Sequence, residues 1–143
     1  MKINKIRVYI GILILLVIIF LVVSCSTFTY SNREEPIETI SVSYLVYATS
    51  DVESISVTYS NPDGGTEQKA DLKPTMFKGE TLQIFTVASF EEFPVDEFIY
   101  LSAQNENDSG DIIASIRVNR EDWKSAESRG GYTIATVSGF YEE

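Results

Sequence analysis

The sequence predicts an all-β domain, an antiparallel β-sandwich of immunoglobulin-like type, behind an N-terminal export signal. From Thr39 onward, apolar residues recur at every second position in short runs, which is the side-chain period of a strand. Turn-forming residues separate these runs about every 8–12 residues, and no run has the 3.6-residue period of a helix. Seven or eight short strands with this spacing are typical of a sandwich.

The first strands follow directly from the alternation. Residues 40–47 and 55–60 each place apolar residues at every second position, so each predicts a strand with one buried face. The next five residues, Asn61-Pro62-Asp63-Gly64-Gly65, predict a turn, because Pro presets φ and Gly supplies φ > 0. Residues 66–71 are polar and predict a returning edge strand, where charge is tolerated.

The second half of the domain continues the same pattern. Strands are predicted at residues 82–87, 98–103 and 112–118, and a weaker one at 123–128. The single tryptophan, Trp123, is interpreted as a core or edge anchor. A turn at Arg129-Gly130-Gly131 then leads into a last strand over residues 132–137.

The N-terminal residues 1–24 have the pattern of a secretory signal. Lys2, Lys5 and Arg7 precede a run from Val8 to Val23 that is apolar apart from Tyr9 and Gly11. The run is slightly shorter than the ~20 residues that span a bilayer. A retained transmembrane helix and an ordinary cleaved signal stay open as alternatives, and all three interpretations export the chain.

The end of that run, Val22-Val23-Ser24-Cys25, resembles the bacterial lipobox. The resemblance implies that Cys25 receives a diacylglyceryl group and becomes the mature N-terminus, with no other cofactor. We therefore expect a signal peptide at 1–24, a lipidated Cys and flexible tether at 25–38, and the β-sandwich at 39–143. The 13 tether residues after Cys25 would span about 20 Å. The expected location is the outside of a bacterial cell envelope, and Ser26 favours the outer membrane in a Gram-negative cell.

The charge and composition exclude several functions. From Cys25 onward the chain has eight basic and 21 acidic residues, so nucleic acid, which needs Lys and Arg against its phosphates, is not an expected partner. There is no His and only one Cys, which argues against a zinc site and a disulfide within the chain. No nucleophile elbow or phosphate loop is present, so the chain is not expected to be an enzyme.

One polar stretch resembles a calcium loop. Oxygen-bearing side chains alternate at Asn105, Asn107, Ser109 and Asp111, with Gly at the sixth position of the loop. However, Ile116 stands where an EF-hand has its bidentate Glu. The stretch is therefore a weak calcium candidate, and a polar hairpin loop explains it equally well.

The stretch from Phe90 to Phe98 combines three Phe with four carboxylates around one Pro, and it predicts a loop. In one interpretation Phe90 and Phe98 end strands and pack inward while the acids are solvated. In the other, Phe93 and Val95 form an exposed apolar tip that contacts a protein partner. Phe90, Phe93 and Val95 are thus the candidate contact residues, and an unpaired strand edge is a further one.

The order of the local signals over residues 44–139 resembles the MmpS-type transport accessory proteins. The likeness is carried by Val57 to Gly64, by Leu101 to Asn105 with Ile116 to Asn119, and by the closing stretch Gly131 to Gly139. The resemblance implies a small membrane-anchored β-sandwich that assists an RND-type exporter, but it assigns no functional residue. The family's Pro-Trp step is absent, because Lys73-Pro74-Thr75-Met76-Phe77 has no Trp.

Together these observations predict a non-enzymatic, lipid-anchored binding or accessory subunit of a cell-envelope complex. The membrane, through the anchor, and an envelope protein are its expected partners. A small-ligand or glycan-binding surface lipoprotein is the alternative, and it requires a concave site with convergent polar groups.

Overall fold

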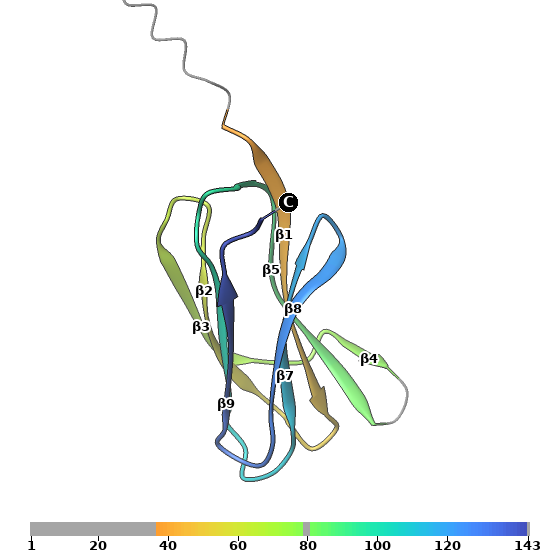
Figure 1. Ribbon diagram of the computed structural model, residues 1–143. Coiled ribbons are helices and arrows are strands. Elements are labelled where there is room, and N and C mark those ends of the chain that lie inside the picture. Colours follow the sequence, from red (N-terminus) through yellow and green to blue (C-terminus); the bar gives the residue numbers. More distant parts are fainter. Residues whose placement is uncertain (1–36, 79–80, 143) are drawn as a thin grey trace, which may run out of the picture. The chain divides into compact units, whose positions relative to one another are not determined.

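A computed structural model describes residues 37–78 and 81–142 of the chain. Nine strands run through this part (Figure 1). They are β1 (Thr39–Thr49), β2 (Ile55–Ser60), β3 (Thr66–Leu72), β4 (Met76–Lys78), β5 (Leu82–Pro94), β6 (Ile99–Asn105), β7 (Ile112–Val118), β8 (Glu121–Ser128) and β9 (Ile134–Gly139).

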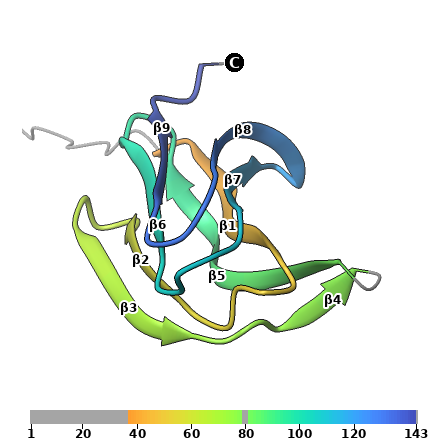
Figure 2. The same cartoon turned by 90° about the horizontal axis from the view of Figure 1, so that it is seen from below.

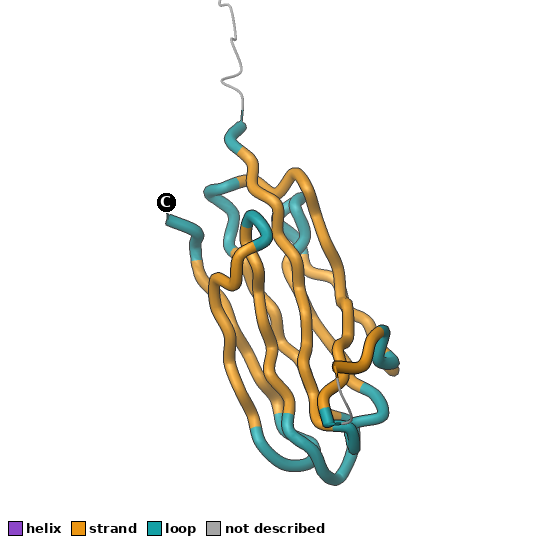
Figure 3. Tube along the Cα trace, turned by 90° about the vertical axis from the view of Figure 1, so that its right-hand side faces the viewer, coloured by secondary structure: helices purple, strands orange, loops and turns teal. Residues whose placement is uncertain are grey.

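The strands form two antiparallel sheets that pack face to face, as the view from below shows (Figure 2). The five-stranded sheet has the order β4-β5-β1-β7-β8, and the four-stranded sheet has the order β3-β2-β6-β9. Loops gather at the two ends of the sandwich (Figure 3). The predicted antiparallel β-sandwich is therefore confirmed, and β3 is the edge strand that its polar sequence predicts.

The core lies between the sheets and consists of the alternating apolar residues that the sequence indicated. In β1 every second residue from Ile40 to Ala48 is at most 4% exposed. Residues of the facing strands β2 and β6 and of the neighbouring strand β7 are equally buried, among them Ile55, Leu101 and Ile116. Burial of apolar side chains at about 25 cal/mol per Å² stabilises this arrangement.

The structure corrects the first half of the loop predicted over residues 90–98, whereas residues 95–98 do connect β5 to β6. Strand β5 does not end near residue 87 but continues to Pro94 and pairs with β1 as far as Thr39. Two register shifts, between Ile40 and Val42 and between Tyr44 and Leu45, give β5 extra residues relative to β1. Such β-bulges interrupt the alternation by which a strand is recognised in a sequence.

The strand count also differs from the prediction, because β4 was missed. Only three residues long, it pairs through Met76 with Ile84 and through Phe77 with Gln83. A three-residue strand is too short to show the alternation.

Aromatic residues gather in one part of the core, where the half-buried Phe90 packs against buried rings. The rings of Tyr44 and Tyr59 lie 5.4 Å apart, and Phe90 lies 6.3 Å from Tyr44 and 6.2 Å from Phe93. The hydroxyls of Tyr44 and Ser60 are hydrogen-bonded at 2.9 Å, and the Tyr59 hydroxyl donates to Glu67 at 2.6 Å. Both buried phenols are thus satisfied, as buried polar groups must be.

Candidate binding surfaces

The most exposed apolar side chains of the five-stranded sheet lie where β4 pairs with the start of β5. Phe77 is 72% exposed, Met76 54% and Leu82 37%. Strand β4 projects at the side of the sandwich (Figure 1), so these side chains have no opposing sheet to cover them. We call Met76, Phe77 and Leu82 the hairpin patch. Met76 and Leu82 lie on the outer face of the sheet, whereas Phe77, which pairs with the buried Gln83, lies on the opposite face of the projecting hairpin.

From Met76, the strand register extends the outer side of this patch across the five-stranded sheet. Met76 is the pairing partner of Ile84, Ile84 of Tyr47, and Tyr47 of Ile113. Paired residues of adjacent strands lie on the same face. Four apolar side chains from β4, β5, β1 and β7 therefore form one row, which we call the apolar row.

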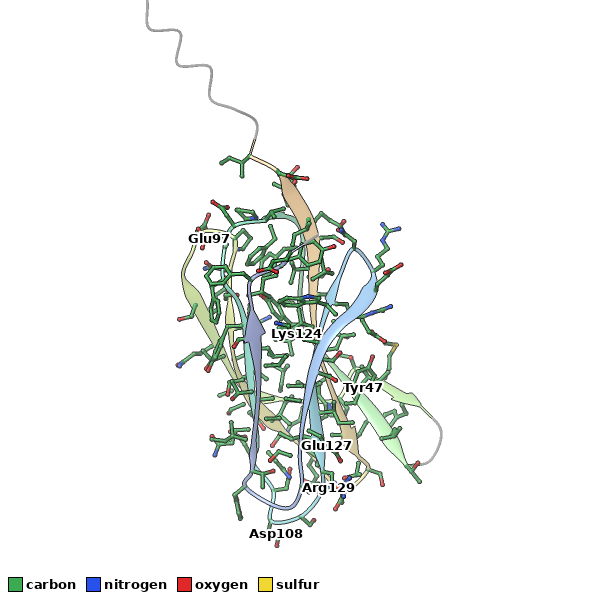
Figure 4. All side chains as sticks on the ribbon, in the orientation of Figure 1. Tyr47, Glu97, Asp108, Lys124, Glu127 and Arg129 are labelled. Atoms are coloured by element: carbon green, nitrogen blue, oxygen red, sulfur yellow. The ribbon has the colours of Figure 1, made fainter. Side chains whose placement is uncertain are left out.

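The apolar row leads into a shallow groove of about 420 Å³. Tyr47 and Ile113 line it from β1 and β7, and Trp123 and Lys124 line it from β8. The Lys124 ammonium lies 4.5 Å from the centre of the Trp123 ring, a cation–π contact. Tyr47 and Lys124 are labelled in Figure 4. Trp123 and Lys124 thus flank the groove, whereas the pairing partner of Ile113 on β8 is Glu127.

The candidate contact residues from the sequence lie elsewhere, and the structure overturns the exposed tip. Phe93 is 0% exposed and belongs to the core. Phe90 and Val95 are half-buried and pack against that core. Phe98, which was expected to pack inward in the other interpretation, is 43% exposed and stacks on Phe140 with ring centres 5.2 Å apart.

The polar residues of the calcium candidate join neighbouring loops through hydrogen bonds to backbone groups. Asn105 is fully buried, and its Nδ2 donates to the backbone oxygens of Ser109, Gly110 and Gly130. Its Oδ1 accepts from the backbone N–H of Asn107.

The other oxygens of this loop are engaged in the same way. Asn107 Oδ1 accepts from the backbone N–H groups of Glu53 and Ser54. Asp111 Oδ1 accepts from the N–H of Gly130. Backbone hydrogen bonds thus account for the side chains of Asn105, Asn107 and Asp111, and Ser109 contributes its backbone oxygen. Within residues 37–78 and 81–142, no group of three or more His, Cys, Asp or Glu could hold a metal ion.

Burial changes the chemistry of two tyrosines in the core. It raises the pKa of Tyr44 to about 12, although the hydrogen bond to Ser60 lowers this pKa. Burial also raises the pKa of Tyr59 to about 12, and the hydrogen bond to Glu67 adds to this effect. Both phenols are therefore neutral at physiological pH, and Tyr59 donates its proton to Glu67.

The predicted lipidation site, Cys25, lies outside the described residues, as do the rest of the signal and most of the tether. In the part of the chain that the structure describes, no helix is long and apolar enough to cross a bilayer. The lipid anchor stays a prediction from the sequence.

No model of a known protein family matches the chain, and neither does any curated protein. The resemblance to MmpS-type proteins and the exporter role that it implies therefore stay predictions. The sequence reasoning also missed the hairpin patch. The signal for it was the apolar pair Met76-Phe77 and the apolar Leu82, which stand on either side of residues 78–81.

Proposed function

We propose that this protein is a non-enzymatic binding subunit of a bacterial cell-envelope complex, held at the membrane by a lipid on Cys25. It contacts its protein partner through the hairpin patch and the apolar row. The observation that carries the proposal is the exposure of Phe77 and Met76 on a projecting strand of an otherwise acidic domain.

The physical argument rests on the composition of this surface. Contiguous exposed apolar side chains are uncommon on soluble domains and often mark a contact site. Aromatic residues and Met are enriched in the centres of protein interfaces, where charged residues are depleted. The hairpin patch supplies Phe77 and Met76, and the apolar row adds Tyr47.

The predicted lipid anchor and the resemblance to MmpS-type proteins indicate where the protein acts and which class of partner it meets. A lipid on Cys25 keeps the domain within tether reach of the membrane, where the collision partners are other envelope proteins. The likeness to MmpS-type proteins makes an exporter one member of that class. A partner bound at the apolar row would leave the four-stranded sheet free.

Site-directed photo-crosslinking in the producing cells tests the proposal. A photoreactive residue at position 77 should give a discrete crosslink to one envelope protein, identified by mass spectrometry. The matched control is position 134, because Ile134 is 56% exposed but lies on the opposite sheet. Equal labelling from both positions, or none from position 77, would refute the proposed contact surface.

Two substitutions separate the contact from the anchor. Phe77→Ser should abolish co-purification of the partner while the protein stays in the membrane fraction. Cys25→Ala should reduce co-purification by removing the lipid. The control Phe140→Ser changes a side chain of similar exposure at another place, and it should leave co-purification unchanged.

A further inference from the structure

The outer face of the four-stranded sheet has a different character from the apolar row. Thr58 pairs with Gln68 on one side and with Ser102 on the other, and Ser102 pairs with Thr136. These four residues therefore form a row of hydroxyl and amide groups across all four strands. The Ser102 and Thr136 hydroxyls are hydrogen-bonded at 2.9 Å.

A second row lies beside the first. Ser56 pairs with Gln104, and Gln104 pairs with Ile134, which is 56% exposed. The two rows line a groove of about 350 Å³. Its walls include Ser56, Thr58, Gln68, Ser102, Gln104 and Ile134.

This groove is neutral although the domain is strongly acidic. None of its lining residues is acidic. Lys69 contributes to the wall, but its ammonium donates to the carbonyl of Val87 at 2.6 Å and lies 5.3 Å from the Tyr59 ring centre. The cation is thus turned to the other side of the sheet. Glu106 accepts a hydrogen bond from Ser56, which places its carboxylate at the rim.

The hydrogen-bonding capacity of the groove is largely unused. Within the described residues, the side chains of Thr58, Gln68 and Gln104 have no hydrogen-bond partner in the protein. Hydroxyls and amides both donate and accept, so they match a ligand that carries many hydroxyls. The exposed Ile134 adds an apolar contact of the kind that the C–H face of a sugar ring needs.

We propose that this groove binds a neutral glycan. Anionic ligands are disfavoured because no ammonium or guanidinium faces the groove, and the rest of the domain repels them. A protein interface centre is disfavoured because aromatic and Met side chains do not line it. An uncharged chain of sugars avoids the repulsion that disfavours anions, and its hydroxyls match the polar side chains of the groove. Such a chain can lie along an open sheet face. The site is on the opposite sheet from the apolar row and does not depend on the proposed protein contact.

Calorimetric titration of the full lipidated chain tests the inference. The protein is kept in a zwitterionic detergent without a sugar headgroup, so that the detergent does not compete. The probes are maltohexaose, cellohexaose and chitohexaose as neutral glycans, and polygalacturonate as an anionic one. At least one neutral hexasaccharide should bind saturably, and polygalacturonate should not. Absence of binding to all three neutral probes overturns the proposal, as does preference for the anionic polymer.

Substitutions locate the site. The double variant Gln68→Ala and Gln104→Ala removes two exposed amides, and it should weaken glycan binding about tenfold because it removes hydrogen bonds to the ligand. Ser125→Ala, on the opposite sheet, is the control and should bind like the unchanged protein. Equal affinity of the double variant and the control would place the glycan elsewhere and overturn the assignment. The partner crosslink from position 77 should be unaffected by the double variant, so the two proposals fail independently.

Discussion

The burial of Phe93 can be measured, and it distinguishes the structure from the exposed tip that the sequence suggested. The ring is 0% exposed and lies 6.2 Å from the ring of Phe90. Truncation of a fully buried Phe to Ala costs about 3–5 kcal/mol, because transfer energy is lost and a cavity remains. Phe93→Ala should therefore remove a large part of the ~5–15 kcal/mol that stabilises a domain.

The assay is urea unfolding and thermal melting of the full chain in detergent, followed by far-ultraviolet circular dichroism. In a domain of ~100 residues each kcal/mol corresponds to about 4–8 °C, so the melting temperature should fall by about 12 °C or more. The matched control is Phe77→Ala, which removes a ring that is 72% exposed. That change should stay within about 0.5 kcal/mol.

Two results would contradict this reasoning. If Phe93→Ala melted like the unchanged protein, the ring would be exposed in solution and the apolar tip would return as a contact site. If Phe77→Ala cost as much as Phe93→Ala, the hairpin patch would be part of a buried cluster and would not be available to a partner.

Three further predictions concern the loops, the tyrosines and the anchor. Gly131→Ala should destabilise the domain strongly, since its new Cβ would lie 2.1 Å from a backbone carbonyl of the neighbouring loop; Gly130→Ala, with open space but φ of 94°, should cost only about 1–2 kcal/mol in a thermal melt. Stability should fall as pH rises from about 10 to 12, because Tyr44 and Tyr59 keep their protons when folded but lose them near pH 10 when unfolded; urea titrations at pH 8, 10 and 11 measure this loss. Cys25→Ala should prevent the gain in mass from the lipid, and mass spectrometry showing the same mature mass for both proteins would contradict lipidation.

Strands with an unbroken alternation could be predicted from the sequence. The bounds of β2 (Ile55–Ser60) and β7 (Ile112–Val118) match the expected ranges, because each buries every second residue along its length. Strand β5 could not be predicted beyond residue 87, because its bulges depend on its pairing with β1 and not on its own residues.

The candidate surfaces required information that the sequence does not contain. The apolar row joins Met76, Ile84, Tyr47 and Ile113, and only the strand register places them side by side. The partners of Asn107 include backbone groups of residues 53 and 54, far away along the chain. The sequence shows the alternating oxygen side chains but not these long-range backbone partners.

The position of β1 has a mechanical consequence for an anchored protein. It is the first strand of the domain, and it pairs with β5 through ten residue pairs and with β7 through seven. A pull on the chain at Ile37 acts along β1, perpendicular to the hydrogen bonds of both ladders. The load is then shared by many backbone hydrogen bonds, which must break together and not one after another. A tethered domain built this way resists unfolding when a bound partner moves away from the membrane and pulls on it.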